Sequence, residues 1–139
     1  MIETEFTGSW PYSPQLFQLS VALYKDHLYV FGGDTTEGSK SALMILNLKS
    51  FSWKLLGSGI TDKNTYNIHW PEMRGSAGCW IDPDKELFCL LYGVVHDLER
   101  NFLRRAPRDF WTYSIKDNRW TRERLRGNFP AVQVKSINF

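Results

Sequence analysis

The chain has 139 residues and a mass of 16.2 kDa, which is the size of one domain and too small for two large ones. Hydrophobic residues make up 42% of the sequence and charged residues 23%, so the composition is globular and a disordered chain is excluded. The net charge of +2 by itself indicates neither a nucleic-acid nor a membrane partner. The longest apolar run, residues 87–95, is much shorter than the roughly 20 residues of a membrane-spanning helix.

Charge and cysteine content indicate where in the cell the protein is expected and where along the chain its charge is concentrated. The first ten residues carry Glu3 and Glu5 and no basic stretch, so we expect no signal peptide. Two cysteines make no disulfide framework, which favours a cytoplasmic or nuclear location. Residues 1–99 carry 7 basic and 12 acidic side chains, whereas residues 100–126 carry 9 basic and 3 acidic ones. The small net charge therefore hides a strongly basic segment near the C-terminus.

Strand signals begin at the N-terminus. Residues 2–7 alternate between apolar and polar and are followed by Gly8 and Pro11, which predicts a short strand and then a turn. We interpret residues 1–13 as the outer strand of a preceding four-stranded unit, followed by a linker.

Two similar units follow, over residues 14–70 and 71–129. Each contains four short segments that are rich in β-branched and aromatic side chains and are bounded by Gly, Pro, Asp, Asn or Ser. The segments are 19–24, 28–33, 42–48 and 53–56 in the first unit, and 77–81, 87–93, 110–115 and 120–125 in the second. None has the length or period of a helix. Each unit is therefore predicted to form a small antiparallel sheet of four strands.

A glycine and aromatic pattern recurs in the two units. The first contains Tyr29-Val30-Phe31-Gly32-Gly33 and then Trp53, and the second contains Tyr113 and Trp120 with six residues between them. The pattern resembles the Kelch repeat, over roughly residues 14–126. This resemblance implies that each unit is one blade of a β-propeller, which is a radial stack of four-stranded sheets.

The second unit departs from the family at the double glycine, where it has Tyr92-Gly93-Val94, and the first unit has Leu46 where the family has Tyr. In the first unit, Gly32-Gly33 is expected to let the backbone turn sharply and approach the crowded propeller axis.

Two blades do not complete a propeller, which closes with about 4 to 8. Residues 130–139 have the pattern of the first strand of a further blade. The expected fold is thus all-β, an incomplete Kelch-type propeller of about two blades. The chain is a piece of a longer protein, a divergent short product, or a protomer that completes its ring with copies or partners. Open blade faces at both ends predict self-association or aggregation unless further blades or a partner cover them.

One face of the predicted blades carries the long loops. Connections between strands 2 and 3, and between strand 4 and the next strand 1, emerge on the same face, and they include residues 94–108 and 57–73. Loops of this length without secondary structure of their own are commonly functional or disordered. The candidate binding residues on this face are Arg100, Phe102, Arg104, Arg105 and Arg108 in the first loop and Tyr66 and His69 in the second.

Arginines beside an aromatic residue favour an acidic peptide as partner, because guanidinium groups bind carboxylates with two hydrogen bonds. A solvated surface loop with a small hydrophobic anchor is the other interpretation of these residues. The Kelch resemblance implies a protein-interaction scaffold, such as a substrate adaptor of a ubiquitin ligase. The alternative is a nucleic-acid-associated binding protein that uses the basic residues 100–126, although the acidic excess of residues 1–99 disfavours a nucleic-acid partner.

Catalytic, cofactor and metal sites are not expected. The three histidines, His27, His69 and His96, lack the spacing of metal ligands, and no Cys-x-x-Cys occurs. Cys79 and Cys89 lie within predicted strands, as inert buried thiols do, and a disulfide between them stays open only for an oxidising compartment. The sequence therefore predicts a binding module rather than an enzyme.

Overall fold

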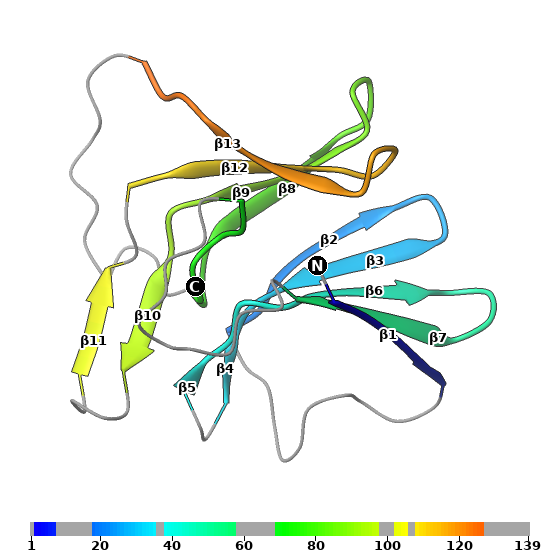
Figure 1. Cartoon of the computed structure of the whole chain (residues 1–139), viewed down its shortest axis with the longest axis horizontal. Helices are drawn as coiled ribbons and strands as arrows, with labels where there is room; N and C mark the ends of the chain where they lie inside the picture. The colour runs from blue at the N-terminus through cyan, green and yellow to red at the C-terminus, as the bar shows by residue number, and fades with distance from the viewer. Residues whose placement is uncertain are drawn as a thin grey trace.

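The computed structural model describes residues 2–7, 18–35, 38–57, 69–97, 102–105 and 108–126 (Figure 1). These residues form strands, turns and bends and no helix, so the all-β prediction is confirmed for them. Two antiparallel sheets, of five and four strands, contain most of the strand residues. No helix that is long and apolar enough to span a bilayer occurs in these ranges. Residues 130–139, which were expected to begin a further blade, lie outside the described residues.

The first sheet is built by residues of the first predicted unit and the N-terminus. Its strands, in spatial order, are β1 (Ile2–Thr7), β7 (Ser52–Gly57), β6 (Leu43–Asn47), β3 (His27–Phe31) and β2 (Ser20–Tyr24). We expected residues 2–7 to belong to a preceding unit. Instead, β1 pairs with β7 along its whole length, from Ile2 opposite Gly57 to Thr7 opposite Ser52. The pairing satisfies the backbone of β7, which would otherwise be an open sheet edge.

The second sheet consists of four strands in the order β13 (Arg119–Glu123), β12 (Phe110–Ser114), β9 (Leu87–Leu91) and β8 (Gly78–Asp82). Tight turns join its hairpins, and one side chain shows how the sequence defines them. Asp82 Oδ1 accepts hydrogen bonds from the backbone N–H groups of Asp84 at 3.1 Å and Lys85 at 3.2 Å. Asp favours turns because its carboxylate can bind the backbone two and three residues further on.

Each sheet also carries a small hairpin, in the connection from β3 to β6 in the first sheet and from β9 to β12 in the second. These hairpins are β4 (Asp34–Thr35) with β5 (Gly38–Ser39), and β10 (Val94–Asp97) with β11 (Phe102–Arg105). Both lie at the same end of the molecule, away from the tight turns (Figure 1). The connection at residues 94–108 was expected to lack secondary structure, and this expectation is wrong, because Val94 and Val95 pair with Arg105 and Arg104.

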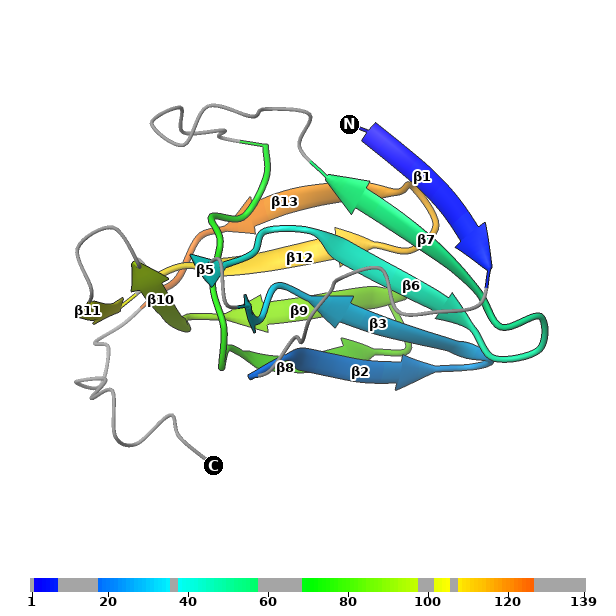
Figure 2. The same ribbon diagram turned by 90° about the horizontal axis from the view of Figure 1, so that it is seen from below.

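The core lies between the two sheets, which form two layers in Figure 1 and overlap when seen face-on in Figure 2. Trp120 of β13 is at its centre, with its ring centroid 5.3 Å from that of Phe31 and 5.4 Å from that of Tyr113. Trp70, which precedes β8, packs edge-on against Trp120 at 6.0 Å and donates its indole N–H to the carbonyl of Ser41. Aromatic side chains from both sheets and from the segment between them therefore meet in one cluster.

The two sheets stack front to back. Trp53 and Trp120 occupy the same position, the second residue of the fourth strand of their units. Trp120 faces the other sheet, whereas Trp53 packs with Val30 and Met44 in a separate cluster on the other face of its sheet. Equivalent side chains thus point in the same direction along the stack, as in a repeat array in which each unit packs on the next.

The outer faces of the stack differ in exposure. On the first sheet, Val30 and Met44 point away from the second sheet and are still only 1% and 0% exposed. On the second sheet, Trp80 is 44% exposed and stacks on Phe110 at 5.6 Å. The expectation of open faces at both ends therefore fails for the centre of the first sheet.

Candidate functional site

The end of the molecule with the two small hairpins is organised by the segment that leads into β8. The N–H of Gly33 donates to the carbonyl of Arg74 at 2.9 Å, and the N–H of Arg74 donates to the carbonyl of Lys40 at 3.1 Å. On its other side, Gly75 exchanges two backbone hydrogen bonds with Val94, of 2.7 and 2.9 Å. This segment therefore bridges the small-hairpin connections of both sheets.

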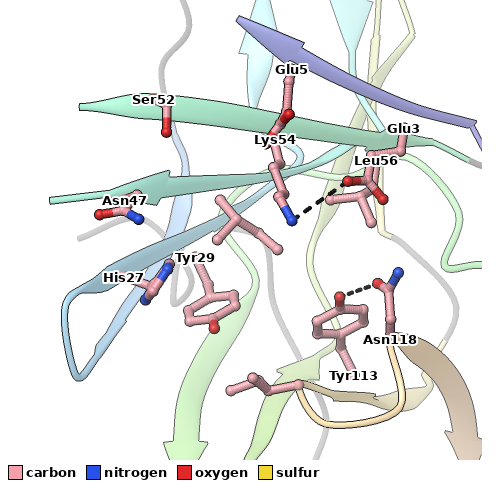
Figure 3. A pocket seen from close by; sticks show the side chains of 12 residues that line it. Glu3, Glu5, His27, Tyr29, Asn47, Ser52, Lys54, Leu56, Tyr113 and Asn118 are labelled. Atoms are coloured by element: carbon pink, nitrogen blue, oxygen red, sulfur yellow. Dashed lines mark hydrogen bonds and ion pairs between the residues drawn. The ribbon is translucent and has the colours of Figure 1, made fainter. Parts of the chain in front are cut away.

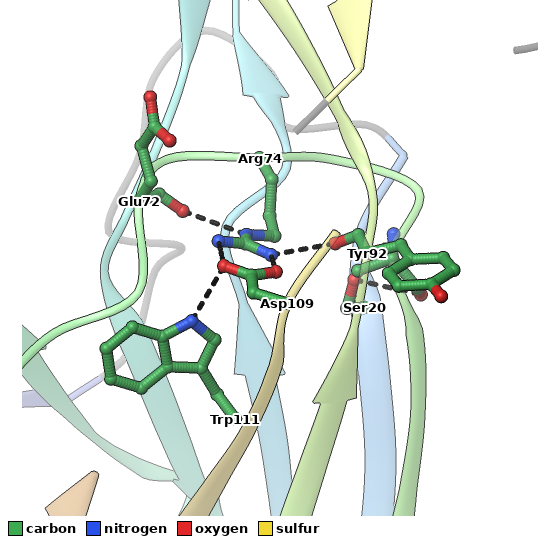
Figure 4. A network of polar contacts seen from close by, with 7 residues as sticks. Ser20, Glu72, Arg74, Tyr92, Asp109 and Trp111 are labelled. Carbon is green, nitrogen blue, oxygen red and sulfur yellow. Dashed lines mark hydrogen bonds and ion pairs between the residues drawn. The ribbon is translucent and has the colours of Figure 1, made fainter. Parts of the chain in front are cut away.

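Arg74 forms a buried ion pair with Asp109 at the centre of this end (Figure 4). Its Nη1 lies 2.5 Å from Asp109 Oδ1, and its Nη2 lies 2.9 Å from Oδ2. Nε donates to the carbonyl of Glu72 at 3.0 Å, Nη1 also donates to the carbonyl of Tyr92 at 2.9 Å, and the indole of Trp111 donates to Asp109 Oδ2 at 2.8 Å. The side chain of Arg74 is fully buried, so these partners replace the water that a buried charge requires.

Arg74 fixes both ends of the connection that carries the β10–β11 hairpin. Tyr92, whose carbonyl it binds, comes just before β10, and Asp109 directly follows the connection. The hairpin thus projects from a base held by a bidentate ion pair. A variable loop on a rigid base is a common architecture for binding sites.

The predicted site residues lie at this end where the structure describes them. Arg108 is exposed beside buried Asp109, and His69 is exposed beside buried Trp70. The predicted residues of β11 are Phe102 opposite Asp97, Arg104 opposite Val95 and Arg105 opposite Val94. Arg100 and Tyr66 fall outside the described residues.

Sequence reasoning missed Arg74 and Asp109, which are 35 residues apart. The sequence carries one weak signal: Arg74 lies in the segment that leads into a predicted strand, and Asp109 directly precedes another. A charged residue at such a position can become buried, and buried arginine and aspartate are almost always paired.

A second feature, the cleft between the two sheets, lies at the end with the tight turns (Figure 3). It has a volume of about 330 Å³ and is lined by Glu3, Glu5, His27, Tyr29, Ile45, Asn47, Ser52, Lys54, Leu56, Tyr113, Ile115 and Asn118. No pattern in the sequence predicts this cleft, because its walls come from strands of both sheets and from β1, whose pairing was not foreseen.

Two tyrosines form the inner part of the cleft. Burial raises the pKa of Tyr29 and that of Tyr113, so both hydroxyls are protonated at neutral pH. The Tyr113 hydroxyl donates to Asn118 Oδ1. At the mouth, Lys54 Nζ lies 3.6 Å from Glu3 Oε1.

Neither end has the arrangement of a metal or thiol site in the described part of the chain. No three His, Cys, Asp or Glu side chains there are placed to hold a metal ion. Cys79 lies opposite Leu90 and Cys89 opposite Trp80, so the two thiols are on opposite faces of the sheet and do not form a disulfide. Burial raises the pKa of both thiols, which lowers their reactivity as nucleophiles.

Comparison of the chain with protein-family models finds no match, and comparison with curated proteins finds none either. Function is therefore inferred from the geometry of the two ends of the molecule.

Proposed function

We propose that the chain is a protein-interaction module whose two sheets are blades of an incomplete Kelch-type propeller. Two features support this proposal: the four-stranded antiparallel units and the front-to-back stacking marked by Trp53 and Trp120. In this proposal, the half-exposed Trp80 and its partner Phe110 mark the face on which a further blade, a second copy or a partner packs.

The observation that carries the binding proposal is the anchoring of the β10–β11 connection by Arg74. The connection contains four arginines in its sequence, and the segment 100–126 has 9 basic and 3 acidic side chains. A partner with an acidic segment matches this charge. Each partly desolvated Arg–carboxylate pair contributes about 1.5–3 kcal/mol, and each exposed pair about 0–1 kcal/mol.

The test is a fluorescence-anisotropy titration with a Glu- and Asp-rich peptide that contains one hydrophobic residue. We expect the double variant Arg104→Glu, Arg105→Glu to weaken peptide binding by about tenfold or more, and added salt to weaken binding of the wild type. The matched control, Lys116→Glu with Arg119→Glu, makes the same charge change at two exposed positions, in the β12–β13 turn and at the start of β13, at the other end of the sheet. It should bind nearly as the wild type does.

Equal losses in the double variant and the control would show that binding follows net charge alone and would overturn the site. A single-stranded oligonucleotide serves as the second probe. Binding that is tighter for the oligonucleotide than for the peptide would favour the nucleic-acid alternative.

A further inference from the structure

The cleft between the two sheets has a negatively charged mouth. Glu3 and Glu5 lie on the same face of β1, and Glu5 is opposite Lys54 in the register with β7. Lys54 forms its ion pair with Glu3, at 3.6 Å, and both side chains are about half exposed. Among the described residues, Glu5 has no cationic partner, so the two carboxylates and one ammonium leave a net charge of −1.

The inner part of the cleft contains a polar group without a partner. Tyr29 as a whole residue is 4% exposed, and its hydroxyl, at the cleft, forms no hydrogen bond with any described residue. Among the described residues, the buried polar side-chain atom without a partner is Trp120 Nε1, so the Tyr29 hydroxyl is open to the cleft and can bind a ligand atom there. Figure 3 shows Tyr29 and Tyr113, from the two facing sheets, directed into the space between them. Ile45, Leu56 and Ile115 supply apolar lining to the cleft.

We propose that this cleft binds a small organic cation, an alkyl amine or alkyl guanidine. The carboxylates of Glu3 and Glu5 bind the cationic group, and the apolar side chains contact its methylene chain. The hydroxyl oxygen of Tyr29 accepts a hydrogen bond from a second polar end of the ligand. The volume of about 330 Å³ is at the lower end of small-molecule sites and suits a short chain of this kind. The site is at the end of the sheets away from the β10–β11 hairpin and does not depend on the binding proposed there.

The probe is 1,5-diaminopentane, titrated into the full chain and followed by calorimetry and by amide chemical shifts. Its matched analogues are 1,5-pentanediol, which has the same chain without charge, and glutarate, which has the opposite charge. We expect saturable binding of the diamine, with chemical-shift changes at β1, β3 and the β12–β13 turn. The diol should bind at least about tenfold more weakly. Absence of saturable binding by the diamine, or equal binding by the diol, overturns the proposal.

Two substitutions at the mouth should act in opposite directions. Glu5→Gln removes the unpaired carboxylate and should weaken diamine binding by about five- to tenfold. Lys54→Gln removes the internal cation that competes for Glu3 and should strengthen binding by a few-fold. Asp84→Asn, an exposed change in the β8–β9 turn, is the charge-matched control and should leave the affinity unchanged.

A purely structural effect would weaken diamine binding in both Glu5→Gln and Lys54→Gln. That result would overturn the proposed site. Both positions are exposed, so folding of the variants is checked by their melting temperatures and near-ultraviolet circular dichroism. Binding of the acidic peptide to the other end should be the same in wild type and both variants, which separates the failure of one site from the failure of the other.

Discussion

The residues that follow β3 and β9 have the same left-handed backbone conformation, yet the first is a glycine and the second a tyrosine. Gly32 has φ +64° and Tyr92 has φ +56°, both in the left-handed region. A Cβ on Gly32 would lie 2.1 Å from the carbonyl oxygen of Arg74, a distance that no side chain tolerates. Tyr92 holds a full side chain in the same conformation, so the turn by itself does not require glycine.

The difference between the two units therefore comes from the chain that packs against them. Arg74 belongs to the segment entering the second sheet, and its backbone lies against Gly32 of the first sheet. Its side chain binds Asp109, which directly precedes β12 in the second sheet. Arg74 thus contacts both units, and of the two equivalent strand-end positions, Gly32 and Tyr92, glycine is needed only at Gly32, where the Arg74 backbone passes.

We expect the largest loss of stability when Arg74 loses its carboxylate partner, Asp109. Asp109→Ala leaves a fully buried guanidinium without its carboxylate and also removes the acceptor of the Trp111 indole. We expect the free energy of unfolding to fall by about 3–5 kcal/mol. Urea unfolding measures this, with Asp117→Ala in the exposed β12–β13 turn as control, expected to change stability by no more than about 0.5 kcal/mol. A loss below about 1 kcal/mol for Asp109→Ala would show that the buried ion pair does not stabilise this end of the second sheet.

Substitution of the two strand ends tests the comparison directly. Gly32→Ala places a methyl group against the Arg74 carbonyl in a left-handed conformation and should cost about 2–4 kcal/mol. Tyr92→Gly relieves left-handed strain and loses the contacts of a partly buried side chain, so its net effect should be within about 1 kcal/mol. The same unfolding measurement applies to both. Equal costs at the two positions would mean that the turn, and not the passing chain, selects glycine.

Strand positions were predictable because they depend on local pattern. Neighbouring residues determine both the alternation that places Trp120 in the core and the turn that Asp82 stabilises between β8 and β9. The pairing of β1 with β7 was not predictable, since an alternating strand of six residues does not specify which sheet edge it joins. The ion pair of Arg74 and Asp109 was missed because its partners are 35 residues apart and are brought together only when the segment entering β8 packs beside the start of β12.

The candidate site was foreseen only in part. The choice of the hairpin end followed from loop lengths, and the described candidates, Arg108, His69 and the three in β11, lie in its connections. The β10–β11 hairpin was missed because the sequence between residues 94 and 108 has no turn signal that separates it from an irregular loop. The cleft was missed because its lining residues come from several strands of both sheets, and no single segment contains them all.

The smallest expected effect concerns a second joint between the units, at the end with the tight turns. The Tyr24 hydroxyl, at the end of β2, donates to Glu86 Oε1 at 3.0 Å, and Lys25 Nζ lies 3.4 Å from the same oxygen. The hydrogen bond from Tyr24, and then the hydrogen bond and charge of Lys25, lower the pKa of the Glu86 carboxyl below its ordinary value of 4.5. Unlike the joint at Arg74, this one is open to solvent.

A folded-state pKa below the unfolded one means that the ionised Glu86 stabilises the folded chain above about pH 4.5. The contribution disappears as the pH falls through the lower, folded value, because the carboxyl is then protonated in both states. We therefore expect Glu86→Gln to melt slightly below the wild type at pH 6, and the two melting curves to converge as the pH approaches 3 (about 1.5 units below the ordinary pKa). Asp84→Asn, in the same turn, should show no such convergence. Because the pair is exposed, added salt should shrink the difference at pH 6, whereas the loss caused by Asp109→Ala should be nearly independent of salt. A difference at pH 6 that resists salt would mean that the exposed joint is as well shielded as the buried one, and the contrast between the two ends of the molecule would fail.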